Sequence, residues 1–345
     1  MKNNTSYLIN QPPALTYSWL GTGGAPIEKP VFTGEISWQE ERHADLFFSR
    51  QTLSPSEGGA EDILKDQDIS LPLNRYHLSE GVKASDALRL DFSCGNDTAG
   101  LFDLHLEAES ELTAVMDFAA EQDKQSAVRT GIHLAKGALL RLVQISRGES
   151  RLTLFNELLI TAEEGARCEL IRLVLGGGKT YDRVLVSLNG EKSRFECETA
   201  YRLANAQELD MNYEILHFGR HTESDIRAAG VLADKAYKIF RGAIDLKKGC
   251  SGSAGSETED VLMLDDTVRN KTLPVILCGE EDVTGNHGAT IGRLDEALVY
   301  YMESRGMDRE AIYEAVASAR IEHAIRRIPD EKTVRRLFPN IWEEA

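Results

Sequence analysis

The histidine at position 287 is the residue of this chain with the clearest chemical potential. It lies in a polar loop of small residues, Asn286–Thr290, which follows the apolar run Pro274–Cys278. Glycine neighbours allow a ligand or another backbone to approach closely, and imidazole is a good ligand for iron and zinc. The residue types alone leave two interpretations open: a metal ligand or an ordinary loop histidine.

Cysteine is the other residue type that could hold a metal. The five cysteines are scattered and contain no C-x-x-C pair, which excludes a disulfide framework and a zinc finger. We expect most of them to be small buried hydrophobes, with Cys278 packed in the core. Cys250 differs because it lies in a glycine- and serine-rich stretch, Lys247–Ser256, where an exposed thiol is conceivable.

Signatures of common enzyme classes are absent from the sequence. It contains no G-x-x-x-x-G-K-[ST] phosphate loop, no G-x-S-x-G elbow and no H-E-x-x-H zinc motif. The net charge of −17 argues against nucleic acid and anionic membrane surfaces as partners. No apolar run is long enough to span a bilayer, and the N-terminus does not resemble a signal peptide, so we expect a cytoplasmic protein.

The elements that position His287 change character along the chain. From about residue 84 to 285, short runs alternate apolar and polar residues between turn residues, as in Arg183–Leu188, which predicts half-buried strands. A sandwich, a barrel and a solenoid all fit this alternation, and no repeat of fixed length is evident. Upstream, residues 1–30 predict an extended arm anchored by Trp19 and Leu20, residues 36–54 a short helix, and residues 54–68 a loop.

The period becomes helical after residue 294. Apolar residues fall at i, i+3, i+4, i+7 and i+8 from Leu294, and Gly306 stops the helix. Asp308 opens a second helix that ends at Pro329, and Asp330 opens a third, short one. The second helix ends in a basic group that includes Arg326 and Arg327, which is either a solvated face or a docking surface.

The C-terminal third resembles the SufB/SufD family, the scaffold subunits of the SUF iron–sulfur cluster assembly machinery. The most specific match is the HGAT-x-G-x-LDE run, His287–Glu296, which is closer to the SufD type than to SufB, where HEAT replaces HGAT. Upstream, Ile239–Ile244 is similar to the family's F-x-G-x-I strand and Val261–Asp265 to its N-L-L-L-S strand. The segment Pro13–Leu20 resembles the arm of SufD-like proteins.

This resemblance implies a right-handed parallel β-helix over residues 85–290, preceded by an N-terminal arm and a small α-containing region (1–84) and followed by a helical module (291–345). It implies a scaffold that is not an enzyme, and that pairs with a SufB-like chain or with itself. A transient cluster would be shared at the subunit interface near His287. The helical module would dock the SufC-type ABC ATPase, which alone would hydrolyse ATP; the contact residues we expect are Leu294, Leu298, Tyr301, Met302, Ile312, Val316, Arg326 and Arg327.

The sequence departs from the family pattern at the thiols. Gly285 stands where SufD-type chains often carry cysteine, and Glu259 stands near the position of a SufB-type cysteine. Cys250 is then a candidate substitute thiol for the metal. Two alternatives stay open: a stand-alone β-helix enzyme that binds metal or acts on carbohydrate, and a self-pairing structural protein without an iron site.

Overall fold

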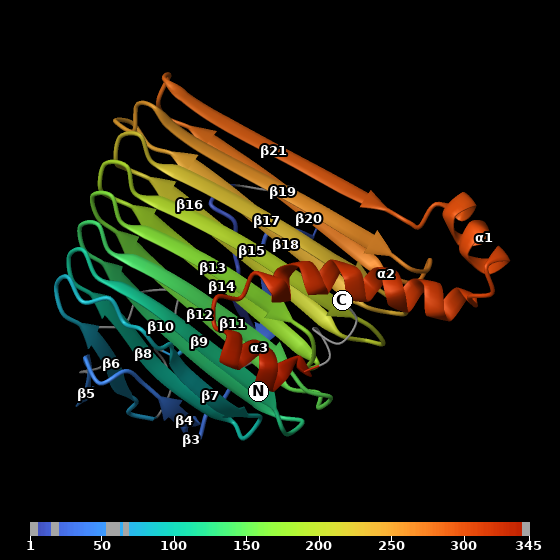
Figure 1. The fold of residues 1–345 in the computed structure, drawn as a ribbon, viewed down its shortest axis with the longest axis horizontal. Helices are drawn as coiled ribbons and strands as arrows, with labels where there is room; N and C mark the ends of the chain where they lie inside the picture. The colour runs from blue at the N-terminus through green and yellow to red at the C-terminus, as the bar shows by residue number, and fades with distance from the viewer. Residues whose placement is uncertain (1–5, 15–20, 53–62, 65–68, 340–345) are drawn as a thin grey trace.

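The main body of the protein is a parallel β-solenoid, seen in a computed structural model that describes residues 6–14, 21–52, 63–64 and 69–339 (Figure 1). Consecutive strands alternate between two sheets, so that each coil contributes one strand to each sheet. Eight such coils run from β6–β7 to β20–β21. The parallel β-helix implied by the resemblance is confirmed.

One sheet holds the even-numbered strands from β6 onward together with β5, and we call it the even-numbered sheet. Its order is β20-β18-β16-β14-β12-β10-β8-β6-β5, with β3 (Gly34–Glu35) beside β8. Its strands are β5 (Leu46–Thr52), β6 (Pro72–Leu78), β8 (Thr98–Leu106), β10 (Gln125–Leu134), β12 (Thr153–Ala162), β14 (Lys179–Leu188), β16 (Glu208–His217), β18 (Tyr237–Leu246) and β20 (Arg269–Cys278).

The second sheet, the odd-numbered sheet, holds the odd-numbered strands from β7 onward together with β4. Its order is β21-β19-β17-β15-β13-β11-β9-β7-β4. Its strands are β4 (Ser37–Glu41), β7 (Leu88–Cys94), β9 (Glu111–Ala120), β11 (Leu139–Arg147), β13 (Arg167–Val174), β15 (Arg194–Leu203), β17 (Glu223–Leu232), β19 (Ser253–Met263) and β21 (Val283–Gly292).

Coil length varies along the solenoid. Hydrogen-bonded partners lie 26 residues apart at Thr153↔Lys179 and 32 apart at Tyr237↔Arg269. Alternate residues of each strand point inward to one continuous apolar core. The variable length explains why the sequence shows no strict repeat even though the backbone is regular.

The expected helix over residues 36–54 is wrong. This segment instead forms β4 and β5, which pair antiparallel with β7 and β6 at the first end of the solenoid. The Trp38 ring packs edge-on against Phe102 with the centroids 5.1 Å apart. Pairing with an existing sheet edge and aromatic packing outweigh the local pattern that favoured a helix. The even-numbered sheet thus extends N-terminal of residue 85.

The three predicted C-terminal helices are present as α1 (Glu296–Ser304), α2 (Arg309–Arg326) and α3 (Glu331–Leu337). Each begins at an aspartate whose carboxylate accepts a backbone N–H of the first turn: Asp295, Asp308 and Asp330. The helices α2 and α3 lie across the outer face of the odd-numbered sheet, whereas α1 projects beyond the strands (Figure 1). None of the helices in the described part of the chain has the length and apolarity needed to cross a bilayer.

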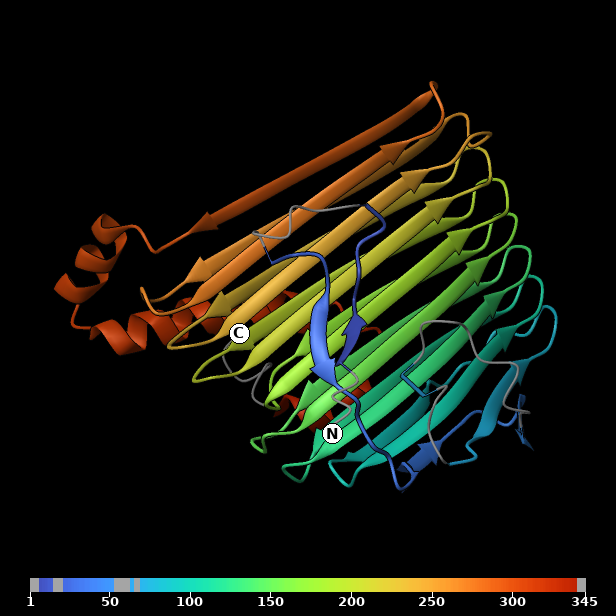
Figure 2. The same ribbon diagram turned by 180° about the vertical axis from the view of Figure 1, so that it is seen from behind.

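The N-terminal arm runs over the outer face of the even-numbered sheet (Figure 2). It contains the antiparallel pair β1 (Ser6–Ile9) and β2 (Ala25–Glu28). Asn10 donates a hydrogen bond of 2.7 Å to Asp210, and Arg241 donates one of 2.6 Å to the carbonyl of Thr22. These buried bonds fix the arm to β16 and β18. The expected anchors Trp19 and Leu20 lie outside the described residues.

Candidate functional site

His287 lies on the last strand of the solenoid and not in a loop. Its strand, β21, pairs with β19 on one side, and no strand covers its other side in the part of the chain that the structure describes. Buried and less buried residues alternate along most of β19, and His287 is the register partner of its buried residue Glu257. His287 therefore belongs to the inward-facing row of a coil that no further coil covers, which is why it is exposed.

Below His287, one coil deeper, Glu257 is a buried carboxyl without a full set of partners. Its side chain is 2% exposed, and its Oε2 atom has no hydrogen-bond partner among the described residues. Burial raises the pKa of Glu257 to about 7, and the nearby Glu259 carboxylate adds to the shift. Gly242 on the opposite strand makes room for this carboxyl, because a Cβ at position 242 would overlap it.

Glu259, two residues along β19, is instead fully engaged. It forms an ion pair with Lys238 and accepts hydrogen bonds from Tyr201 (3.2 Å) and Thr272 (2.5 Å). Desolvation lowers the pKa of the Lys238 amine, and the Glu259 charge opposes that shift. The acid that stands near a SufB-type cysteine position is thus held in a buried ion pair, whereas Glu257 keeps an unpartnered oxygen.

Other polar side chains are buried deeper inside the solenoid, where they form a hydrogen-bonded network. Arg172 donates to Asp182 at 3.0 Å, and Tyr213 and Asn156 donate to the same carboxylate at 2.9 and 2.6 Å. The Arg172 and Asp182 side chains are both 0% exposed. Sequence reasoning missed this network and Glu257; their signal was charged residues at inward positions of otherwise apolar strands.

The exposure of the two cysteines near this end is the reverse of what the sequence suggested. Cys250 is buried beneath Ile276 and Val283, and burial raises the pKa of its thiol, so the exposed thiol considered for Lys247–Ser256 is wrong. Cys278, expected in the core, is exposed because β20 ends the even-numbered sheet. Both outcomes depend on the position of the last coil, because its residues cover Cys250 while no further coil covers Cys278 in the described structure.

Gly285 also has a local structural reason. It is the register partner of Gly255 and faces Ile276 across the last coil. A Cβ built at Gly285 would lie 2.9 Å from the Cγ2 atom of Ile276. The space that a cysteine side chain would enter is therefore occupied by an aliphatic side chain.

The apolar face of α2 is used within the chain. Ile312 is buried, and Val316 packs with Leu294 against the odd-numbered sheet at Val231 and Leu262. Further along α2, Ile321 and Ile325 lie in a second cluster with residues of β9, β11 and β13. Ile312 is therefore not at the surface, and the contacts with the sheet leave Val316 and Leu294 partly buried.

The basic residues of α2 also contact the protein itself. Arg327 pairs with Glu198 on β15, and Arg326 lies 3.4 Å from Glu322 one turn earlier. Arg202 on β15 forms a bidentate pair with Glu314 of α2, at 2.7 and 2.5 Å. The basic end of α2 is thus, at least in part, an attachment to the sheet.

The helix α1 differs, because its apolar side chains face solvent. Leu298 is 43% exposed, Tyr301 54% and Tyr300 73%, while Val299 is the buried residue of this helix. Met302 is half-buried. Exposed aromatic side chains grouped on one short projecting helix are typical of a protein contact.

Comparison with known proteins settles the family. The family model described as "SUF system FeS cluster assembly, SufBD core domain" matches residues 98–319, which is more than half of the chain. The chain belongs to the SufBD family. The matched region begins at β8 and ends within α2, so it includes Glu257, His287 and α1.

Individual relatives agree with this assignment. The chain is 29% identical to the iron–sulfur cluster assembly protein SufD of Bacillus subtilis over 164 residues, which are 48% of this chain and 38% of that protein. It is 22% identical to SufD of Escherichia coli over 285 residues (81% and 65%), and 21% identical to SufB of B. subtilis over 264 residues (75% and 57%). The alignments thus span less than two thirds of these relatives' own length.

Proposed function

We propose that the protein is a SufD-like scaffold subunit of iron–sulfur cluster assembly, acting in the cytoplasm without catalytic activity of its own. Its uncovered coil would pair with a SufB-like chain or with a second copy and share a nascent cluster near His287. Its helix α1 would dock a SufC-type ATPase, which would supply the ATP hydrolysis. The observation that carries the proposal is the SufBD match over a solenoid whose last coil presents a histidine above a buried carboxyl with one unpartnered oxygen in the described structure.

Pairing at the last coil is supported by its edges. Strands β20 and β21 end the two sheets, so each presents a row of backbone N–H and C=O groups without a strand partner in the described structure. Long uncovered edges of this kind favour association with another chain. Small inward-facing residues, Gly285 and Ala289, would allow a partner backbone to approach His287 closely.

An iron site at this junction is supported by its donor atoms. The imidazole of His287 and the carboxylate of Glu257 come from register partners on neighbouring strands, which lie about 4.8 Å apart. Nitrogen and oxygen donors of this kind suit divalent iron. Two residues do not complete a coordination shell, so the partner chain would provide the remaining ligands, including any thiolate.

The iron site is tested by anaerobic reconstitution with iron and sulfide, alone and with a SufB-like partner. We expect His287→Ala to lower the yield of cluster on the pair without changing the amount of pair recovered by gel filtration. The matched control is His323→Ala, which removes an exposed histidine on α2. An unchanged cluster yield for His287→Ala would remove His287 from the site, and a chain that pairs but never holds a cluster would favour the structural alternative.

ATPase docking needs a different test, because deleting the helical module would uncover the apolar face formed by Val143, Ile145 and Leu173. Substitutions on α1 avoid this damage. We expect Leu298→Asp with Tyr301→Ser to abolish co-purification with a SufC-type ATPase while the unfolding temperature stays unchanged. The control replaces Phe218, an equally exposed aromatic residue of the solenoid, by serine. Retained binding by the α1 variant would refute docking through this helix.

A further inference from the structure

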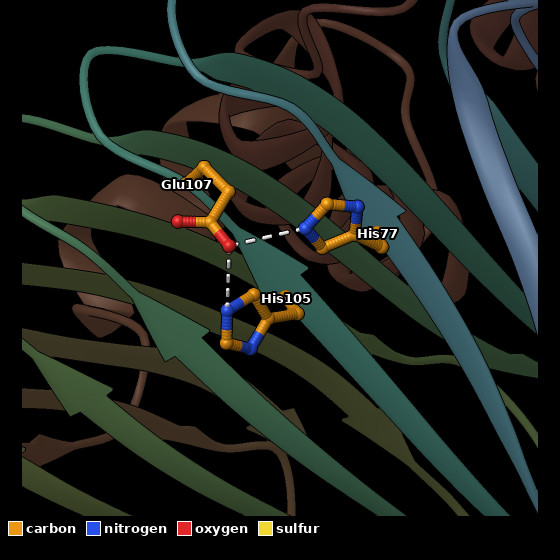
Figure 3. A group of neighbouring side chains, drawn as sticks. All are labelled: His77, His105 and Glu107. Carbon is orange, nitrogen blue, oxygen red and sulfur yellow. Dashed lines mark hydrogen bonds and ion pairs between the residues drawn. The ribbon is translucent and has the colours of Figure 1, made fainter.

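Three side chains at the first end of the solenoid converge on one point of its outer surface. His77 lies near the C-terminal end of β6, and His105 is its register partner on β8. Glu107 follows His105 by two residues, just after β8 ends at Leu106. The Nε2 atoms of His77 and His105 lie 3.1 and 3.3 Å from the same Glu107 oxygen, Oε1. Figure 3 shows both rings turned toward this carboxylate.

Two of the three spacings between these atoms match those of metal ligands. All three donor atoms lie within 4.8 Å of one another. Ligands bound at about 2.0 Å in a tetrahedral zinc site are separated by roughly 3.3 Å. The two nitrogen–oxygen distances therefore already equal the edges of such a tetrahedron. With the ring protons on Nδ1, both Nε2 lone pairs and the carboxylate would face one ion.

The surroundings hold the rings in place. The His105 ring is stacked between His77, with centroids 5.5 Å apart, and His133, at 4.7 Å. His133 is in turn fixed by Thr161, whose hydroxyl lies 3.0 Å from its Nδ1. Stacking on both faces restricts the rotation of the His105 ring. The ligand side chains are 31–41% exposed, so an ion can enter and leave.

We propose that His77, His105 and Glu107 form a binding site for one divalent transition-metal ion. Two imidazoles and one carboxylate suit zinc or ferrous iron, whereas magnesium and calcium prefer sites made of oxygen atoms alone. Three protein ligands leave at least one coordination position for water or for an exchanging ligand. An exposed and incomplete shell of this kind takes up an ion reversibly.

This site is separate from the last coil. Six strand spacings of the even-numbered sheet divide β8 from β20, a distance of roughly 30 Å at about 4.8 Å per strand. The proposal therefore does not rest on the proposed scaffold function. It concerns the outer surface of the solenoid, and it holds or fails without a partner chain.

Cobalt titration of the full chain tests the proposal. The protein is produced without a histidine tag and in a His287→Ala background, so that the last coil contributes no imidazole. We expect one Co²⁺ to bind with the visible absorption of a four- or five-coordinate ion, and Zn²⁺ to displace it while Mg²⁺ does not. The variants His105→Ala and Glu107→Gln should each weaken binding by at least about tenfold.

The matched control is His323→Ala, which removes an exposed histidine on α2 that has no part in the site. Its titration should keep the stoichiometry of one, and circular dichroism should show all variants folded. The proposal is overturned if no Co²⁺ binds at micromolar concentration. It is equally overturned if His105→Ala and Glu107→Gln bind Co²⁺ as the parent does, or if His323→Ala loses the ion while they keep it.

Discussion

The buried ion pair between Lys238 and Glu259 offers a sharp test of how the last coils are stabilised. Both side chains are essentially inaccessible, at 0% and 1% exposure. Replacing Glu259 by Gln keeps an acceptor for Tyr201 and Thr272 but leaves the ammonium without its counter-charge. Breaking one partner of a buried pair costs about 3–5 kcal/mol of the free energy of unfolding.

The pH sets an upper bound on that cost. A lysine of ordinary pKa near 10.4 can shed its proton at pH 7 for about 4.6 kcal/mol, at about 1.4 kcal/mol per pH unit. The unfolded state of Glu259→Gln would then bind one more proton than the folded state, so its stability should rise with pH between 7 and 10. We expect the deficit to shrink from about 4 kcal/mol at pH 7 to about 2 kcal/mol at pH 9.

The double variant Lys238→Met with Glu259→Gln completes the cycle. It removes both charges, so its stability should return to within about 2 kcal/mol of the parent, with a coupling energy of at least about 2 kcal/mol. Guanidinium unfolding followed by circular dichroism measures all four proteins at pH 7 and 9. The ion-pair reasoning would be refuted if the stability losses of the two single variants simply added up in the double variant, or if the loss in Glu259→Gln did not change with pH. Glu259 would then be a candidate metal ligand.

Three further predictions address other parts of the fold. Burial lowers the pKa of His217 to about 4, below its value near 6.5 in the unfolded chain. The parent should therefore lose about 3 kcal/mol of the free energy of unfolding as the pH falls from 6.5 to 4. The variant His217→Gln should remove that loss in acid unfolding curves. Ile325→Ala should cost about 2–4 kcal/mol and make α2 and α3 more sensitive to limited proteolysis, because Ile325 seats them on the sheet. Gly242→Ala should lower the unfolding temperature, because the new Cβ overlaps the Glu257 carboxyl at a cost of about 1–3 kcal/mol of the free energy of unfolding. Adding Glu257→Ala to the same chain should restore part of that stability.

The helices could be predicted from the sequence because their signals are local. A 3.6-residue period and the caps Asp295, Asp308 and Asp330 determine where each helix begins. The alternation of apolar and polar residues predicts the strands, but it does not predict which strands pair or in what order the coils stack. Residues 36–54 were wrongly predicted as a helix because their strands are stabilised by pairing with β6 and β7, which are distant in sequence.

The candidate sites show the same limit. Cys250 and Cys278 were assigned the wrong exposure because burial in a solenoid depends on whether another coil follows. The histidine cluster did leave a signal that was overlooked. His77, His105 and His133 are each followed by leucine and are spaced by 28 residues, which equals the register offset between their strands. A spacing that repeats the coil length marks residues that stack, even where no overall repeat is visible.

The composition of the last inward-facing row bears on what covers it. In an inner coil such as that of β13, this row holds Cys168, Leu170 and Arg172, all buried under the next strand. In β21 the corresponding row begins with Val283 and continues with Gly285, His287, Ala289 and Ile291, so its three middle positions hold no large apolar side chain. A row that meets another aliphatic coil would expose hydrophobic surface here. The glycine itself is already required within the chain, because a Cβ at position 285 would lie 2.9 Å from Ile276. The small residues Gly285 and Ala289 beside the imidazole of His287 leave room for a second backbone that brings its own polar ligands, as the shared metal site that we propose would require.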